Sequence, residues 1–207
     1  MRRRRSAPPI LGKRRVVSFR AVIFDWRGTL VSVLSNAAWV RESLVLLGRE
    51  ARPDAVHGIL SAILQANGPQ NRLDAPGIDT SADLHRRTFM AVLDDAGLDE
   101  SQAAALYAVK SDPRHNPFAE DVLLTLTTLH RAGSKLAVVS DIHFDLRPAF
   151  AAAGLHELID VFTLSFEQGV QKPDPLMFTR TLDALDVHPP EVLMVGDRSH
   201  PDGAAVE

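Results

Sequence analysis

Three features of this 207-residue sequence predict an α/β fold with an all-helical insertion. Short apolar runs that end at polar residues are typical of parallel strands buried on both faces. Stretches with helical spacing alternate with these runs, which favours a parallel sheet with right-handed crossovers. The segment 35–116, between the first two runs, lacks strand-like patterns. We therefore expect a core of parallel strands and helices that is interrupted once by helices alone.

Four strands are expected from the apolar runs. Ala21–Phe24, Leu136–Val139 and Val192–Val195 are continuous apolar segments, and Val161–Leu164 is a weaker candidate. Between them, helices are predicted at three places where apolar residues recur at helical spacing. These are Phe118–Arg131, closed by Gly133, then Leu146–Ala153, closed by Gly154, and Leu176–Leu185. Glycine just after the last apolar residue is a common helix stop.

The segment 35–116 has the pattern of several short helices. They are expected near Ala37–Leu47, Asp54–Gln65, Leu84–Ala96 and Gln102–Lys110. Breaks containing Gly and Pro separate them. The predicted organisation is thus a basic leader at 1–15, an α/β core formed by 16–34 and 117–207, and a helical cap at 35–116. The sequence ends soon after its last motif, so we expect the C-terminal edge of the core to be truncated.

Composition narrows the class of protein. Hydrophobic residues make up 45% and charged residues 24% of the chain, as is ordinary for a globular protein. Cysteine is absent, which excludes disulfides and thiolate metal sites. No apolar run approaches the length of a membrane span, so we expect a cytoplasmic protein with no membrane partner.

The first 20 residues differ in charge from the rest. They hold eight cations and no acid, so a net charge of −3 leaves −11 on the remainder. A basic arm could contact nucleic acid. No aromatic residues interleave these arginines, however, and stacking aromatics are usual in a nucleic-acid platform. We therefore interpret the leader as a disordered extension.

Four short motifs carry polar residues at strand ends. They are Asp25-Trp26-Arg27-Gly28-Thr29-Leu30, Ser140-Asp141, Lys172-Pro173-Asp174-Pro175 and Gly196-Asp197 followed by Asp202. In open parallel sheets, ligands bind at the carboxyl ends of the strands, so these motifs are expected to meet there. Each one alone has an ordinary explanation as a turn or a helix cap. Their combination in this order is far harder to explain in that way.

The residue types suit phosphoryl chemistry. Asp25 can act as a carboxylate nucleophile, and Lys172 can neutralise the nucleophile and the transferring group. Gly28 permits a tight turn in which Thr29 offers a hydroxyl and a backbone donor. Ser140 can hydrogen-bond a phosphoryl oxygen.

A metal site is predicted beside the nucleophile. Asp25 and Asp197 would bind Mg²⁺ through hard carboxylate oxygens. Asp202 would support the site by binding metal-coordinated water. The metal would offset the repulsion between a carboxylate and a phosphate dianion.

These motifs resemble those of the haloacid dehalogenase-like hydrolase superfamily, with a Rossmann-like core and a helical cap inserted after the first motif. The likeness extends from about Val16 to the C-terminus and is specific in the core. It implies a Mg²⁺-dependent phosphatase that acts on a small phosphorylated metabolite through an aspartyl-phosphate. It also implies that the backbone carbonyl of Arg27 binds the metal. The superfamily's usual final strand is missing, and Asp141 stands where Asn is frequent.

Arg27 departs from the phosphatase pattern. In the phosphatases that the chain resembles, the side chain at this position protonates the leaving group and later activates water. An arginine stays charged and can do neither. General acid–base catalysis is worth about 10²–10⁴-fold, so a large loss of rate is expected. Arg27 could instead bind an anionic substrate group.

Other activities of the superfamily remain as alternatives. Dehalogenases lack the pattern kept here as Asp197 and Asp202, which argues against that activity. A catalytically weakened phosphoryl-binding module would account for Arg27. A phosphonatase-like C–P hydrolase would need a cap lysine that forms a Schiff base. Lys110, the one lysine in the predicted cap, lies late in that segment and is expected on the surface.

Four histidines are candidates for lining a pocket near the cap, although we expect most of them to be surface or capping residues. They are His85, His115, His143 and His200. No pair has convincing metal-ligand spacing. His200 is expected near the metal because it precedes Asp202 by two residues.

Overall fold

The computed structural model describes residues 19–203, and the leader predicted at 1–15 lies outside them. Its sheet has four parallel strands in the order β3-β2-β1-β4. The strands are β1 (Ala21–Phe24), β2 (Lys135–Ser140), β3 (Val161–Leu164) and β4 (Val192–Val195). Each expected strand is present, and β2 is one residue longer at each end. The α/β prediction is confirmed.

The register of the strands brings the motifs to one edge of the sheet. Phe24, the last residue of β1, pairs with Val138 of β2 and with Val195 of β4. Ser140, at the end of β2, pairs with Leu164 of β3. Because all four strands run in the same direction, the residues that follow them emerge together.

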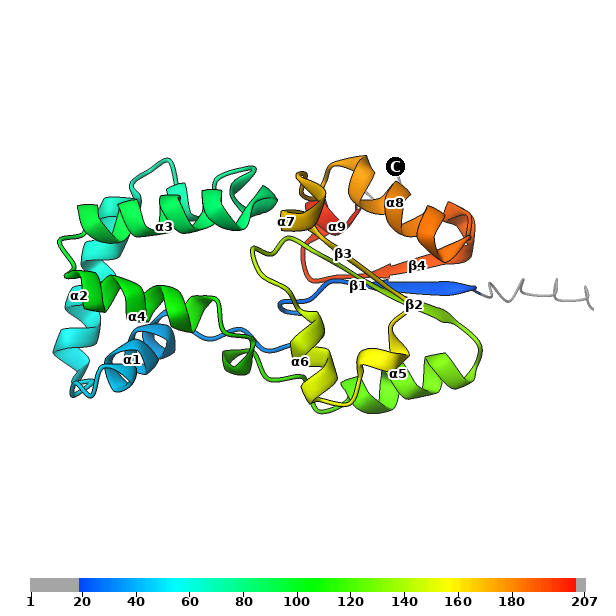
Figure 1. Ribbon diagram of the computed structural model, residues 1–207, viewed down its shortest axis with the longest axis horizontal. Coiled ribbons are helices and arrows are strands. Elements are labelled where there is room, and N and C mark those ends of the chain that lie inside the picture. The colour runs from blue at the N-terminus through cyan, green and yellow to red at the C-terminus, as the bar shows by residue number, and fades with distance from the viewer. Residues whose placement is uncertain (1–18, 204–207) are drawn as a thin grey trace, which may run out of the picture.

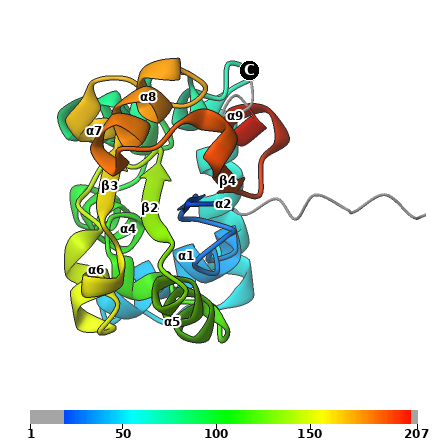
Figure 2. The ribbon, with the colours of Figure 1, turned by 90° about the vertical axis from the view of Figure 1, so that its right-hand side faces the viewer.

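Each face of the sheet is covered by apolar side chains. Alternate residues of β1, such as Val22 and Phe24, pack with Leu126 of α5 (Val122–Arg131) and Phe150 of α6 (Arg147–Ala152). On the other face, Ile23 packs with Met177 of α8 (Pro175–Leu185). Figure 2 shows α8 on one side of the strands and α5 and α6 on the other.

One predicted helix begins later than expected. Residues 118–121 are not helical, and α5 begins at Val122. The reason is a contact with the loop after β1. Phe118 forms a bridge with Val31, and the Ala119 amide donates to the Leu30 carbonyl at 3.0 Å. This pairing ties the start of the second core segment to the first motif.

The segment predicted as a cap contains four α-helices with their own apolar core. They are α1 (Asn36–Leu46), α2 (Pro53–Asn67), α3 (Ala82–Asp95) and α4 (Glu100–Lys110). Side-chain caps from Ser35, Ser81 and Asp99 fix the starts of α1, α3 and α4. Phe89, Leu93 and further buried residues join these helices into one cluster. Figure 1 shows them beside the sheet and its helices, and we keep the interpretation that residues 35–116 form a cap.

Two short helices complete the core. They are α7 (Ser165–Gln168), after β3, and α9 (Ser199–Gly203), after β4. Within residues 19–203, no helix has the length and apolar character needed to cross a membrane.

Candidate functional site

A buried lysine lies between two aspartates at the carboxyl edge of the sheet. The Lys172 ammonium donates to Asp25 Oδ1 at 2.8 Å and to Asp202 Oδ1 at 2.5 Å. The lysine side chain is fully enclosed, and the two carboxylates are 6% and 7% exposed. Three motifs that are distant in the sequence therefore meet at one ammonium group.

Each residue reaches this point from its own element. Asp25 directly follows β1, Lys172 precedes α8, and Asp202 lies in α9. The Asp202 carboxylate also accepts the Arg198 amide at 3.1 Å, which holds it in place. Burial raises the pKa of Asp25, and the charge and hydrogen bond of Lys172 act against that rise. A carboxylate beside an ammonium is available as a nucleophile.

Asp197 approaches the same point from the end of β4. Its Oδ2 lies so close to Gly28 that a Cβ on that glycine would be only 2.2 Å from it. Gly28 also has a φ of +77°, which disfavours any other residue. The glycine of the first motif thus makes room for a carboxylate of the last.

The three carboxylates fit a divalent cation that prefers oxygen. Asp25, Asp197 and Asp202 each offer an oxygen, and these oxygens lie within 4.8 Å of one another. Lys172 neutralises only one of the three negative charges. Hard carboxylate ligands in this number suit Mg²⁺. We conclude that the residues present match the expected metal, while the roles of the individual ligands stay predictions. We define Lys172, Asp25, Asp202 and Asp197 as the lysine-centred cluster.

Asp141 supports this cluster in a way that the sequence did not reveal. Its Oδ1 accepts the backbone amide of Lys172 at 2.8 Å, and Arg198 lies 3.4 Å from its Oδ2. Burial raises the pKa of Asp141 to about 6, against the opposing charge of Lys172. The carboxylate therefore positions the backbone of the loop that carries the lysine.

Two further predicted residues, Ser140 and Thr29, follow or end the neighbouring strands. Ser140 ends β2 and is 2% exposed. The Thr29 hydroxyl is buried without a hydrogen-bond partner among the described residues. Both remain predicted phosphate ligands.

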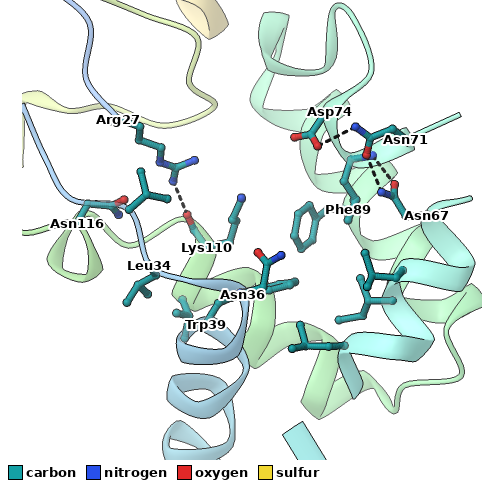
Figure 3. A pocket seen from close by; sticks show the side chains of 16 residues that line it. Arg27, Leu34, Asn36, Trp39, Asn67, Asn71, Asp74, Phe89, Lys110 and Asn116 are labelled. Atoms are coloured by element: carbon teal, nitrogen blue, oxygen red, sulfur yellow. Dashed lines mark hydrogen bonds between the residues drawn. The ribbon is translucent and has the colours of Figure 1, made fainter. Parts of the chain in front are cut away.

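Arg27 extends toward the cap. Its Nη2 donates to the backbone carbonyl of Lys110 at 3.1 Å, and its guanidinium lies 5.9 Å from the centre of the Phe144 ring. The expectation that Lys110 is a surface residue is wrong. Lys110 ends α4 and lines a cavity with Arg27, and burial lowers its pKa to about 8. We call Arg27 and Lys110 the cationic pair (Figure 3).

A second group that sequence reasoning missed joins the cap to the core. His85 of α3 stacks on His143, which follows β2, with ring centroids 3.4 Å apart. Asp79 lies beside both rings, and its carbonyl accepts from Ser165 of α7 at 2.7 Å. His85 and His143 are 3% exposed, so they are not surface residues. His200 is exposed in α9, and His115 is partly buried.

Comparisons with known proteins agree with this geometry. A family model for "haloacid dehalogenase-like hydrolase" matches residues 19–206. The phosphoserine phosphatase of Thermus thermophilus is 31% identical over 63% of this chain and 55% of its own length. The glyceraldehyde 3-phosphate phosphatase of Methanopyrus kandleri is 29% identical over 75% of this chain and 70% of its own length. The chain thus spans little more than half of the first of these relatives.

Solved structures show the same fold. A HAD phosphatase from Thermococcus onnurineus is 26% identical, with a TM-score of 0.58 over 90% of this chain and 81% of its own. The L-2-haloacid dehalogenase from Xanthobacter autotrophicus is 24% identical, with a TM-score of 0.63 over 90% of this chain and 73% of its own. The family match spans almost the whole chain, and the four motifs meet at one edge of the sheet. The chain therefore belongs to the haloacid dehalogenase-like hydrolase family.

Proposed function

We propose that this protein is a Mg²⁺-dependent phosphohydrolase that acts on a small phosphorylated molecule. One observation carries the proposal. The Lys172 ammonium lies between the carboxylates of Asp25 and Asp202, with an Asp197 oxygen in the same group. Transfer of a phosphoryl group to a carboxylate requires a nucleophile, a fixed cation beside it and further acidic oxygens that can hold a metal ion. This site supplies all three. Relatives named as phosphatases support the same reaction class.

The reaction would proceed in two displacements. An oxygen of Asp25 attacks phosphorus, the P–O ester bond breaks, and the leaving oxygen takes a proton from water. Water then attacks the aspartyl-phosphate, which releases inorganic phosphate and restores the carboxylate. Lys172 holds Asp25 in position and stabilises negative charge on the phosphoryl oxygens. When bound, Mg²⁺ would supply positive charge that offsets the repulsion between carboxylate and phosphate.

Arg27 is the reason why we expect slow hydrolysis of phosphomonoesters. The residue cannot donate or accept a proton at neutral pH, so both displacements depend on water alone. The loss of general acid–base catalysis corresponds to about 10²–10⁴-fold. Substrates whose leaving groups need no proton, such as acyl phosphates, should lose least. The same residue favours a second candidate, a phosphoryl-binding module with little turnover.

A panel of phosphomonoesters and acyl phosphates, with and without Mg²⁺, tests these two candidates. For the hydrolase we expect metal-dependent turnover that is lost in Asp25→Asn and increased in Arg27→Asp. Binding of phosphate analogues without turnover, with activity only in Arg27→Asp, would favour the binding module. Absence of both binding and turnover in wild type and Arg27→Asp would contradict both candidates.

The position of Lys110 favours a third candidate, a C–P hydrolase that forms a Schiff base. A pKa lowered to about 8 leaves part of the amine neutral near pH 7. Borohydride in the presence of phosphonoacetaldehyde would then attach the substrate carbon to Lys110. An unmodified Lys110 peptide in mass spectrometry would reject this candidate.

A further inference from the structure

Two cations lie side by side beneath the cap without an acidic partner. Arg27 donates from Nη2 to the carbonyl of Lys110 at 3.1 Å, so the backbone of α4 holds the guanidinium. Within residues 19–203, no carboxylate oxygen lies within 4.0 Å of either side chain's nitrogen atoms. The Arg27 Nε is enclosed and has no hydrogen-bond partner among these residues. The cationic pair is therefore uncompensated.

Such an arrangement is unfavourable in the absence of a ligand. Arg27 and Lys110 are half-buried, and a charge that loses part of its hydration without an ionic partner is not compensated for that loss. Burial and the neighbouring Arg27 both lower the pKa of Lys110, while Asp74 and Asp79 attract it only from a distance. An anion placed between the two cations would remove the repulsion between them.

The space next to the pair can hold a small molecule. A cavity of about 220 Å³ is lined by Arg27 and Lys110 at one end. Figure 3 shows the Lys110 side chain rising between Arg27 and Phe89, with Asp74 across the cavity. The walls between these ends are mixed, because Trp39 and other apolar residues line them together with four asparagines. The cavity thus combines one cationic end with walls of apolar and amide side chains and an acidic far end.

The cavity shares Arg27 with the segment that carries the nucleophile. Arg27 is two residues after Asp25, and burial lowers the pKa of Arg27 while the charges of Asp79 and Asp25 act against that fall. A molecule whose phosphoryl group lies at Asp25 would extend its remaining part toward the cationic pair. Arg27 belongs to the core and Lys110 to the cap, so one substrate group would contact both.

We propose that Arg27 and Lys110 bind a carboxylate of the substrate, which makes the substrate class a phosphomonoester with a carboxylate a few bonds from the phosphate. This inference rests on the proposed phosphohydrolase function. The free donors of a planar guanidinium suit the two oxygens of a carboxylate. A second phosphate is less suitable, because its greater charge would face Asp74 across the same small cavity.

Binding to an inactive variant tests this separately from turnover. The variant is Asp25→Asn with Mg²⁺ present, checked for folding by circular dichroism. Calorimetric titration compares O-phosphoserine with phosphoethanolamine, which differ only in the carboxylate. Phosphoglycolate and ethyl phosphate form a second matched pair without an ammonium group. The same titrations are repeated in Asp25→Asn combined with Lys110→Met, Lys110→Arg or the control Lys135→Met. Lys135, the first residue of β2, contacts the Leu185 carbonyl of α8 and does not line the cavity.

The carboxylate member of each pair should bind at least about tenfold more tightly, as expected for a hydrogen bond between charged groups. Lys110→Met should remove most of that preference, while Lys110→Arg retains part of it and Lys135→Met all of it. Equal affinity within both pairs, a preference unchanged by Lys110→Met, tighter binding of a bisphosphate, or no binding at all would overturn the inference. Failure of the wild type to turn over any phosphate, with the binding preference intact, would count only against the hydrolase.

Discussion

The lysine-centred cluster and the cationic pair both gather charged side chains at buried or half-buried positions, but only in the cluster does a cation contact carboxylates. Lys172 contacts two carboxylates at 2.8 and 2.5 Å. Arg27 donates to the backbone carbonyl of Lys110, and neither side chain forms an ion pair with an acid among the described residues. Buried charges are tolerated when they are paired, and unpaired ones lower stability. The difference indicates that the cluster holds its geometry before substrate arrives, whereas the pair is completed by a ligand.

Among the substitutions that test this comparison, Lys172→Met should change the free energy of unfolding most. The change leaves Asp25 and Asp202 buried beside each other without their shared cation. Breaking a buried ion pair from one side costs about 3–5 kcal/mol, and we expect a loss of that size in the free energy of unfolding. Urea denaturation without Mg²⁺ measures it. A loss below about 1 kcal/mol, the value of an exposed pair, would mean that the cluster is not balanced by this lysine.

A smaller change in stability is expected when the pH is lowered, because of the stacked His85 and His143 between cap and core. Burial, with the charge of His143, lowers the pKa of His85 from 6.5 to about 3. Between these values the unfolded chain takes up a proton that the folded protein does not, so stability falls as pH falls below 6.5. At pH 5 the loss from this group is about 2 kcal/mol relative to pH 7.

Denaturation at both pH values, compared between wild type and His85→Phe, measures this contribution. Phenylalanine keeps an aromatic ring against Phe89 and His143 but cannot be protonated. The variant should lose about 2 kcal/mol less on acidification. An identical pH dependence in both proteins would show that folding does not lower the pKa of His85.

The smallest effect, and one of opposite sign, is expected from Lys110→Met in the absence of ligand. The folded protein disfavours the protonated amine, because the pKa of Lys110 falls from 10.5 to about 8. Removing the charge should raise the free energy of unfolding at pH 7 by about 1–2 kcal/mol, as replacement of buried charges by apolar groups frequently does. The same substitution therefore has opposite signs at the two sites. Destabilisation by Lys110→Met would mean that an acid compensates the pair.

The lysine-centred cluster was accessible from the sequence, whereas the cationic pair was not. Asp25 follows its apolar run directly and Asp197 follows after one glycine, so the parallel sheet places them together once the strands are known. Arg27 and Lys110 are 83 residues apart, and they meet because the end of α4 lies beside the loop that follows β1. A lysine at the end of a helix has the pattern of a surface residue, and no local signal indicated otherwise.

The same reason explains the two other omissions. Asp79 and His85 belong to the segment interpreted as a cap and His143 to the core, so His143 joins the other two only where cap and core are in contact. The bond from the Lys172 amide to Asp141 depends on the path of a loop, which residue patterns do not define. The late start of α5 has a similar origin, since Phe118 pairs with the loop after β1. Strands and strand-end motifs follow from local sequence, and contacts between distant loops do not.

The most direct test of the central claim is acid quenching during steady-state turnover of an acyl phosphate with Mg²⁺, followed by peptide mapping of Asp25. Because Arg27 cannot activate water, the second displacement should be slow. The account predicts that a phosphoryl group accumulates on Asp25 in the wild type and that Arg27→Asp, which restores a general base, lowers this fraction. Hydrolysis of the acyl phosphate with no phosphoryl group on Asp25 in either protein would contradict the account.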